Sequence, residues 1–426
     1  MNERELAVDI LMEMDKRDAY GHILLRERLN RAGGGARQKA FTVELVNGCV
    51  RRRILLDYII DCFSKTPSSK MKPFILTLLR VSVYQLRFMD RVPAAAAVDE
   101  AVKLTKKRGF GALSGFVNAV LRSVVRQADQ IQYPQDPTGR LSVLYSYPEW
   151  LAAYLIQRFG FSRAERICQA ETVRPKMHLC VNTTRVSQPE LTRILEAEGV
   201  TAALDGQNGI QAEHTDNIQQ KPSFQKGFFH VMDESAMRAV ETLAPVPGGT
   251  LLDLCAAPGG KSFYSAYLME NRGRIVACDI HPGKLRLVQR AAERLGLSVM
   301  ETRLLDARAY HVELDQTADR LILDAPCSGL GVIRKKPDLK YRKTEADIHA
   351  LAALQREMLE NSWRYVKPGG ALVYSTCTIT TEENAENVRW FAARFPFMLE
   401  SAVQIWPDGR ENRDGFYIAR FVRDEE

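Results

Sequence analysis

The second half of the chain alternates short apolar runs with stretches of helical periodicity, and this alternation restricts the possible fold more than any other feature. The apolar runs lie at 250–254, 274–278, 319–323 and 371–374. Strands that are separated in sequence by helices pair in parallel with right-handed crossovers, so the pattern predicts an open α/β sheet. Ligands of such sheets bind beyond the carboxyl ends of the strands, which makes the residues after these runs candidates for a site.

Two cysteines follow two of these runs. Cys327 lies in Asp-Ala-Pro-Cys-Ser-Gly (324–329), and Cys377 lies in Ser-Thr-Cys-Thr (375–378). Their positions predict two thiols at one edge of the sheet, where they could take part in chemistry. A free cysteine is usually a small buried hydrophobe, however, and each thiol taken alone is more often structural. The eight cysteines of the chain include no Cys-x-x-Cys pair, so neither a zinc site nor a thioredoxin-like redox motif is indicated.

Basic residues are concentrated in the first third of the chain. Residues 1–130 contain 23 Lys and Arg against 14 Asp and Glu, a net charge of +9, whereas the whole 426-residue chain carries +7. A basic module ahead of a nearly neutral remainder indicates a polyanionic partner, of which nucleic acid is the commonest. The alternative is a basic surface that is merely solvated. Two short clusters, 51–53 and 106–108, are candidates for phosphate contacts.

The chain is too long for one ordinary domain, and its patterns predict three. Residues 1–130 have helical spacing, and a polar stretch with prolines at 128–139 then breaks the periodicity. Residues 140–235 mix helix and strand patterns, and residues 236–426 contain the parallel sheet. The sequence shows neither the apolar core of a signal peptide nor a run of about 18 apolar residues, which predicts a cytoplasmic protein with reduced thiols.

A tight turn of small residues follows the first strand of the predicted sheet, at 253–261 (Asp-Leu-Cys-Ala-Ala-Pro-Gly-Gly-Lys). Such a turn brings a ligand close to the backbone at the start of a helix. It is not a P-loop, because Cys255 stands where that motif requires glycine and Pro258 lacks an amide hydrogen. Gly-x-Gly-x-x-Gly is also absent, which leaves an adenosine-type ligand without a pyrophosphate. Asp279, at the end of the next strand, is placed to accept hydrogen bonds from a ribose; a helix cap is the structural alternative.

Three of these motifs resemble those of a known family. The segments 253–261, 324–329 and 375–378 resemble the Nol1/Nop2/Sun family of S-adenosylmethionine-dependent RNA cytosine C5-methyltransferases. The helical front, at 78–86 and 98–122, is similar to the NusB antiterminator domain. The resemblance implies a multidomain fold with an all-α NusB-like domain, a small α+β insert of RNA-binding type, and an α/β Rossmann-like class I methyltransferase domain.

The resemblance also implies a site for S-adenosylmethionine. The methionine moiety would contact the turn formed by Cys255, Ala256, Ala257, Pro258, Gly259, Gly260 and Lys261. The ribose would bind to Asp279 and the adenine amino group to Asp306. Asp324 would contact both the cofactor and the target base.

In the reaction of this family a cysteine thiolate attacks C6 of cytosine and makes C5 nucleophilic. Covalent catalysis of this kind divides one difficult step into easier ones. Spacing alone does not tell which thiol attacks. By resemblance, Cys377 is the nucleophile, Cys327 assists release of the product, and Asp324 contacts the base.

The partner that the resemblance implies is small-subunit ribosomal RNA, with cytosine 967 of the 16S molecule as the expected target. No metal, membrane or obligate protein partner is expected. Three alternatives stay open: C5 methylation of another ribosomal or transfer RNA cytosine, a non-catalytic RNA-binding factor with a vestigial site, and a methyltransferase for small molecules or DNA. The last alternative leaves the basic helical domain unexplained.

Overall fold

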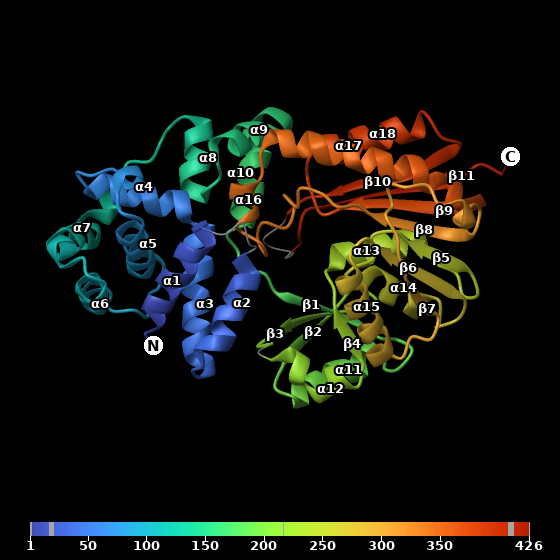
Figure 1. The fold of residues 1–426 in the computed structure, drawn as a ribbon, viewed down its shortest axis with the longest axis horizontal. Coiled ribbons are helices and arrows are strands. Elements are labelled where there is room, and N and C mark those ends of the chain that lie inside the picture. Colours follow the sequence, from blue (N-terminus) through green and yellow to red (C-terminus); the bar gives the residue numbers. More distant parts are fainter. Residues whose placement is uncertain (1, 17–20, 216, 408–412, 426) are drawn as a thin grey trace. The chain divides into compact units, whose positions relative to one another are not determined.

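The structure is a computed structural model that describes residues 2–16, 21–215, 217–407 and 413–425 (Figure 1). The chain divides into two compact units. The first comprises Met1–Thr172 and Ile333–Arg342, and the second comprises Val173–Val332 and Lys343–Glu426. This division follows spatial contacts, and the domain boundaries predicted near residues 130, 140 and 235 remain predictions from sequence.

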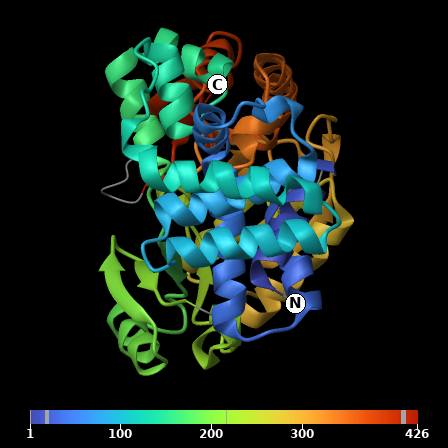
Figure 2. The same ribbon diagram turned by 90° about the vertical axis from the view of Figure 1, so that its left-hand side faces the viewer.

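The first unit is built from helices that pack around one long, buried helix. This central helix is α5 (Pro73–Phe88), which begins with the proline that favours a first helical turn. The other helices of the unit are α1 (Glu3–Lys16), α2 (Gly21–Ala32), α3 (Ala36–Arg51), α4 (Arg53–Phe63), α6 (Ala94–Lys107), α7 (Ser114–Gln127), α8 (Pro137–Tyr145), α9 (Glu149–Phe159), α10 (Phe161–Ala170) and α16 (Leu339–Arg342). Helices α1, α3, α4, α6 and α7 contact α5. Figure 2 looks onto this unit and shows its helices packed side by side, as the helical spacing predicts.

Residues 333–342, termed here the returning segment, belong to the helical unit although they come late in the sequence. Lys340 of this segment is 1% exposed, and its Nζ donates to the carbonyls of Arg51 at 3.0 Å and Tyr145 at 3.1 Å. Burial lowers the pKa of Lys340 to about 7. These hydrogen bonds satisfy a buried polar group and fix the returning segment to the helices.

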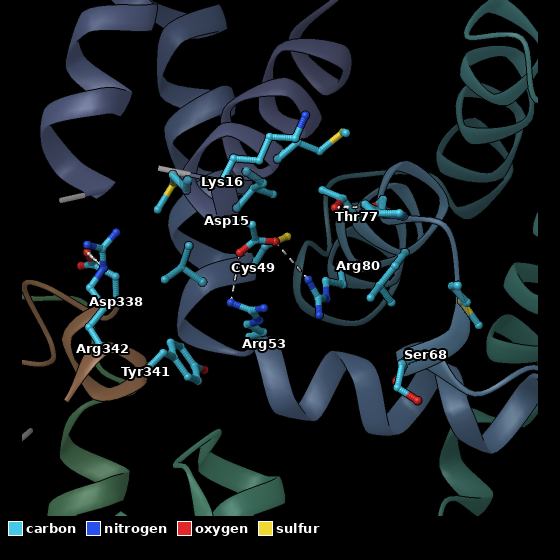
Figure 3. A pocket seen from close by; sticks show the side chains of 18 residues that line it. Asp15, Lys16, Cys49, Arg53, Ser68, Thr77, Arg80, Asp338, Tyr341 and Arg342 are labelled. Atoms are coloured by element: carbon cyan, nitrogen blue, oxygen red, sulfur yellow. Dashed lines mark hydrogen bonds and ion pairs between the residues drawn. The ribbon is translucent and has the colours of Figure 1, made fainter. Parts of the chain in front are cut away.

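A cavity of about 790 Å³ lies in the helical unit beside the returning segment (Figure 3). All three of its arginines are paired with acids: Arg53 lies 3.1 Å from Asp15, Arg80 lies 2.6 Å from Asp57, and Arg342 lies 3.4 Å from Asp338. No predicted cofactor-binding or catalytic residue lines this cavity.

Both basic clusters of the helical unit take part in its packing. The guanidinium of Arg52 lies 4.2 Å from the centre of the Phe88 ring. Lys107 and Arg108 form ion pairs with Glu5 at 2.6 Å and 3.0 Å. The clusters therefore stabilise the unit as well as contributing positive charge.

The second unit begins with a small α+β region. Its elements are β1 (Met177–Val181), α11 (Gln188–Ala197), β2 (Thr201–Asp205), β3 (Gly209–Glu213), α12 (Pro222–Gln225) and β4 (Phe229–Val231). The four strands form an antiparallel sheet in the order β2–β3–β1–β4. Strand-like runs at 177–181 and 228–232 and helical spacing at 189–198 predict β1, β4 and α11 from sequence, whereas β2 and β3 are found only in the structure.

The rest of the second unit contains the larger sheet. In chain order its elements are α13 (Glu234–Leu243), β5 (Thr250–Asp253), α14 (Gly260–Leu268), β6 (Arg274–Asp279), α15 (Pro282–Leu295), β7 (Met300–Leu304), β8 (Ala318–Asp324), α17 (Glu345–Ser362), β9 (Val366–Thr376), α18 (Asn387–Ala392), β10 (Phe397–Ile405) and β11 (Phe416–Arg423). The strand order is β10–β11–β9–β8–β5–β6–β7. Strands β9 to β7 pair in parallel, and β10 and β11 are antiparallel additions. The strand order reverses at β5 and β8, which is the switch point where sheets of this type bind ligands.

The central strands of this sheet, β5, β6, β8 and β9, are buried on both faces. Ile322 of β8 packs in one core with residues of α13 and α14, whereas Leu321 and Leu323 pack in the other with residues of α17 and α18. Figure 1 shows these two pairs of helices on opposite faces of the sheet. In the sequence, strands that are buried on both faces appear as continuous apolar runs. The four strands predicted from such runs are confirmed as β5, β6, β8 and β9.

Candidate active site

The two sequence-predicted thiols meet at the carboxyl edge of the larger sheet. Asp324 at the end of β8 lies opposite Ser375 in the neighbouring parallel strand β9. The loops that follow carry Cys327 and Cys377, whose Sγ atoms are 3.3 Å apart. Both cysteine side chains are half-buried. The sulfur atoms are therefore in hydrogen-bond contact, although 50 positions separate them in the sequence.

This contact sets the protonation of the pair. The hydrogen bond to Cys377, together with burial, holds the pKa of Cys327 well above its usual range. Cys327 therefore keeps its proton near neutral pH and can donate it in a hydrogen bond to the sulfur of Cys377. The thiolate is the nucleophilic form of cysteine, and a hydrogen bond to a charged form favours that form.

Asp324 is held by two donors, one from helix α14 and one from the neighbouring strand β9. Nζ of Lys261 lies 2.5 Å from its Oδ2, and Oγ of Ser375 donates to its Oδ1 at 2.8 Å. Burial lowers the pKa of Lys261, but the nearby charge of Asp324 outweighs this effect, so that the net pKa is raised. Lys261 is therefore an ammonium ion. A carboxylate has about four acceptor positions, so Asp324 retains capacity for a further partner.

Residues 255–261 form the turn after β5 and the first residues of α14, and contacts between the ends of this segment fix it. Oγ of Ser262 in α14 donates to Oδ2 of Asp253 at 2.6 Å. Gly259 has φ +106°, and a Cβ there would lie 2.3 Å from the Phe263 ring, so only glycine fits. Among the residues that the structure describes, Asp253 Oδ1 is buried without a hydrogen-bond partner. The turn thus offers a buried acceptor beside small residues at the switch point.

Asp279 makes a hydrogen bond at the helix start, as one of the two interpretations made from sequence expects, and the ribose contact stays a prediction. It is a buried residue at the end of β6, and its Oδ1 accepts a hydrogen bond from the amide of His281 at 2.8 Å, just before α15 begins. The turn role therefore occupies one oxygen. The other carboxylate oxygen can still accept a hydrogen bond from a ribose hydroxyl.

Asp306 follows β7 and is paired with a residue that sequence reasoning missed. Nε of Arg308 lies 3.0 Å from Oδ1, and Nη2 lies 2.6 Å from Oδ2. These hydrogen bonds to Arg308 are the main cause that lowers the pKa of Asp306. A ligand that uses Asp306 must share it with Arg308 or displace that side chain.

Glu383 is a second residue that sequence reasoning missed. It is fully buried and accepts hydrogen bonds from Ser328, which is the residue after Cys327. In the sequence it stands in Thr-Glu-Glu-Asn, a pattern typical of an exposed helix start. Only its position shortly after the second cysteine motif could have drawn attention to it.

Within the described ranges, no cluster of His, Cys, Asp and Glu suited to a metal ion is present. The helices of those same ranges include none with the length and apolar character needed to cross a bilayer.

Comparisons with known proteins cover nearly the whole chain. Family models match at 1–126 (NusB family), 147–219 (RsmF/B-like methyltransferase, ferredoxin-like domain) and 240–422 (16S rRNA methyltransferase RsmB/F). The probable ribosomal RNA small subunit methyltransferase B of Bacillus subtilis is 38% identical over 97% of this chain and 97% of its own. The probable ribosomal RNA small subunit methyltransferase B of Synechocystis is 35% identical over 99% of this chain and 100% of its own. The solved structure of a methyltransferase homolog protein from Pyrococcus horikoshii covers 68% of this chain and 98% of its own, with 29% identity and a TM-score of 0.59.

The parallel sheet with its switch point, taken with these similarities, defines a methyltransferase of the class I fold. The matches confirm the predicted fold class, with its NusB-like helical part, its small α+β part and its Rossmann-like methyltransferase part. The chain belongs to the family of ribosomal RNA small subunit methyltransferase B. The roles predicted for individual site residues stay predictions.

Proposed function

We propose that the chain methylates C5 of a cytosine in small-subunit ribosomal RNA, with S-adenosylmethionine as methyl donor and a covalent bond between Cys377 and C6 as intermediate. The observation that carries this proposal is the pair of thiols, with sulfur atoms 3.3 Å apart, beside Asp324. Methylation at a base nitrogen or a ribose oxygen needs no thiol nucleophile. The names of the relatives support the substrate class, and the family expectation for the target is cytosine 967 of 16S RNA.

The residues around the β5 turn fit S-adenosylmethionine. The turn 255–261 places small residues at the start of a helix, and the unpartnered oxygen of Asp253 suits the amino group of a methionine moiety. Asp279 is assigned to the ribose and Asp306 to the adenine. When bound there, the cofactor supplies an electrophilic methyl group.

Attack by Cys377 prepares the base. Its thiolate forms a bond to C6, and the electrons of the C5–C6 double bond move so that C5 becomes an enamine carbon. Negative charge builds on the ring at the same time. Asp324 is assigned the contact near N3. As the charge builds, N3 takes up a proton that the ammonium of Lys261, 2.5 Å from Asp324, supplies through this carboxyl group.

Release of the product breaks the bond between Cys377 and C6. After methylation C5 carries both the methyl group and the original hydrogen. A water molecule takes this hydrogen as a proton, the C5–H electron pair forms the C5–C6 double bond, and Cys377 leaves as a thiolate. Cys327 is assigned to this step. Its Sγ lies 3.3 Å from that of Cys377, so its retained proton can form a hydrogen bond to the departing thiolate and stabilise it.

The RNA must present its base outside the stack. Unstacking costs a few kcal/mol and least in a single-stranded loop. The basic helical unit is assigned to the phosphates of the flanking RNA, which makes the affinity dependent on salt.

Transfer of tritiated methyl groups from S-adenosylmethionine to small-subunit ribosomal RNA, transfer RNA and DNA tests the proposal. We expect 5-methylcytosine in ribosomal RNA, and a comparison of naked RNA with 30S subunits identifies the form of the substrate. Label in transfer RNA or in another ribosomal RNA cytosine would support the nearest alternative. No transfer to any acceptor would support a non-catalytic RNA-binding factor.

The assignment of the thiols is tested with two variants. Cys377→Ala should abolish methylation, because no nucleophile remains. Cys327→Ala should accumulate an RNA–protein adduct that survives denaturing electrophoresis, because release is slowed. Cys62→Ser, at an exposed thiol of the helical unit, is the control that should change neither assay. An adduct formed by Cys377→Ala would exchange the two roles.

A further inference from the structure

Glu383 is a carboxylate with no exposed surface, in the π-helical turn Glu382–Glu386. Its two oxygens accept four hydrogen bonds. Oγ of Ser328 at 2.5 Å and Oγ1 of Thr380 at 2.8 Å donate to Oε1. The amide of Ser328 at 2.8 Å and Nε2 of Gln355 at 2.9 Å donate to Oε2. A carboxylate accepts about four such bonds, so the chain itself saturates this one.

The same carboxylate connects the loops of the two thiols. Ser328 directly follows Cys327, and its Oγ lies 2.7 Å from Oγ1 of Thr378, the residue after Cys377. Because the hydroxyl of Ser328 donates to Glu383, the hydroxyl of Thr378 donates to Ser328. A line of hydrogen bonds therefore runs from Glu383 through the residue that follows each cysteine.

Gln355 of α17 extends this network. Its Nε2 also donates to the carbonyl of Pro326 at 3.0 Å, and its Oε1 accepts from the hydroxyl of Tyr374 at 3.0 Å. A buried network with all its partners resists displacement, because breaking one bond leaves an unpaired group at a cost of about 1–3 kcal/mol. The carboxylate thus joins both loops to α17 and β9.

We propose that Glu383 is a positioning residue that holds Cys327 and Cys377 at the separation their two steps require, without touching the substrate. The effect of Glu383 on the reaction rate rests on the proposed function, whereas its effect on the distance between the two thiols does not. Attack and release take place at the same carbon of the base, so both sulfurs must reach one small region. A displacement of about 1 Å can cost on the order of 100-fold in rate.

Two substitutions test whether Glu383 positions the two thiols or only fills buried space. Glu383→Leu keeps a similar volume and removes all the acceptors. Glu383→Gln is the conservative variant, because its carbonyl can accept from the two N–H groups and its amide can donate to the two hydroxyls once these rotate. Glu386→Leu is the matched control: Glu386 is half-buried in the same turn and makes no described hydrogen bond to either cysteine loop.

Phenylarsine oxide measures the spacing of the thiols directly, since its arsenic atom bonds to two sulfurs, with release of water, only when both reach it. The wild-type chain, Glu383→Gln and Glu386→Leu should each capture the reagent, as measured by intact mass against Cys327→Ser as background. Glu383→Leu should lose this capture. Its kcat should fall on the order of 100-fold with KM for RNA and cofactor unchanged.

Circular dichroism and thermal unfolding establish that each variant is folded. If Glu383→Leu does not fold, Thr378→Val takes its place, because it removes only the hydroxyl that joins Thr378 to Ser328, and slower capture is expected. A folded Glu383→Leu or Thr378→Val chain that captures the reagent and turns over like the wild type overturns the proposal. Normal capture by a wild-type chain that transfers no methyl group overturns the proposed function instead.

Discussion

Asp253, at the end of β5, is a buried carboxylate whose contribution to stability depends on pH. Burial raises its pKa from 3.8 to about 6, so the folded chain binds this proton more tightly than the unfolded chain does. The stabilising effect of the proton is therefore complete below about pH 3.8 and is lost as the pH rises through about 6. Above that range the buried charge costs about 3 kcal/mol.

Asp253→Asn should remove this cost. We expect the variant to unfold at higher urea than the wild type at pH 8, with an advantage of up to about 3 kcal/mol that disappears near pH 4. Urea titrations of both chains at the two pH values measure the difference. An equal difference at both values would show that the charge of Asp253 is not its cause.

At the scale of single residues, the sequence predicts which side chains matter better than it predicts their contacts. Lys261 and Asp324 are both predicted site residues, but their ion pair depends on β5 and β8 being neighbours. The local sequence does not determine the order of strands in a sheet. Glu383 was missed for a related reason. Its burial follows from packing against α17 and the Cys327 loop, whereas the sequence around it is polar.

At the scale of elements, strands buried on both faces are predictable and exposed ones are not. The four central strands are apolar runs, but β10 at the sheet edge exposes most of its residues, including Met398 and Val403. Strand β11 was missed because Arg420 interrupts its apolar residues. The turn after β5 was predictable because its glycine and proline content restricts local conformation directly.

The turn after β5 should be intolerant of a side chain at Gly259. In Gly259→Ala the new Cβ would lie 2.3 Å from the Phe263 ring at a φ of +106°, so we expect a loss of about 1–3 kcal/mol and weaker binding of S-adenosylmethionine. Thermal unfolding with and without the cofactor measures both effects. Gly283→Ala, in α15, is the control, since its Cβ would meet only the end of Arg286 at 3.8 Å. If Gly259→Ala and Gly283→Ala changed the unfolding temperature and the effect of the cofactor equally, the steric argument would be contradicted.

At the scale of the whole molecule, the charge of the helical unit should appear in the salt dependence of RNA binding. Arg37 and Lys106 are exposed basic residues of this unit. Arg37→Gln together with Lys106→Gln should reduce the slope of log affinity against log salt by about 0.7 to 0.9 for each phosphate that the variant no longer neutralises. Arg272→Gln, in the exposed loop before β6 at the opposite edge of the sheet from the thiols, should leave it unchanged. Binding titrations at several salt concentrations decide the matter, and an unaltered slope for the double variant would exclude these two residues as phosphate contacts.

Because the returning segment comes late in the sequence, the ribosome completes the helical unit only late in synthesis. Lys340 fills a position beside Arg51 and Tyr145, yet the ribosome adds it long after both. A nascent chain that has reached residue 172 therefore still lacks a part of its first compact unit. That unit is completed only after Cys327 has been synthesised, so a chain interrupted earlier has neither a complete helical unit nor the first of the two thiols.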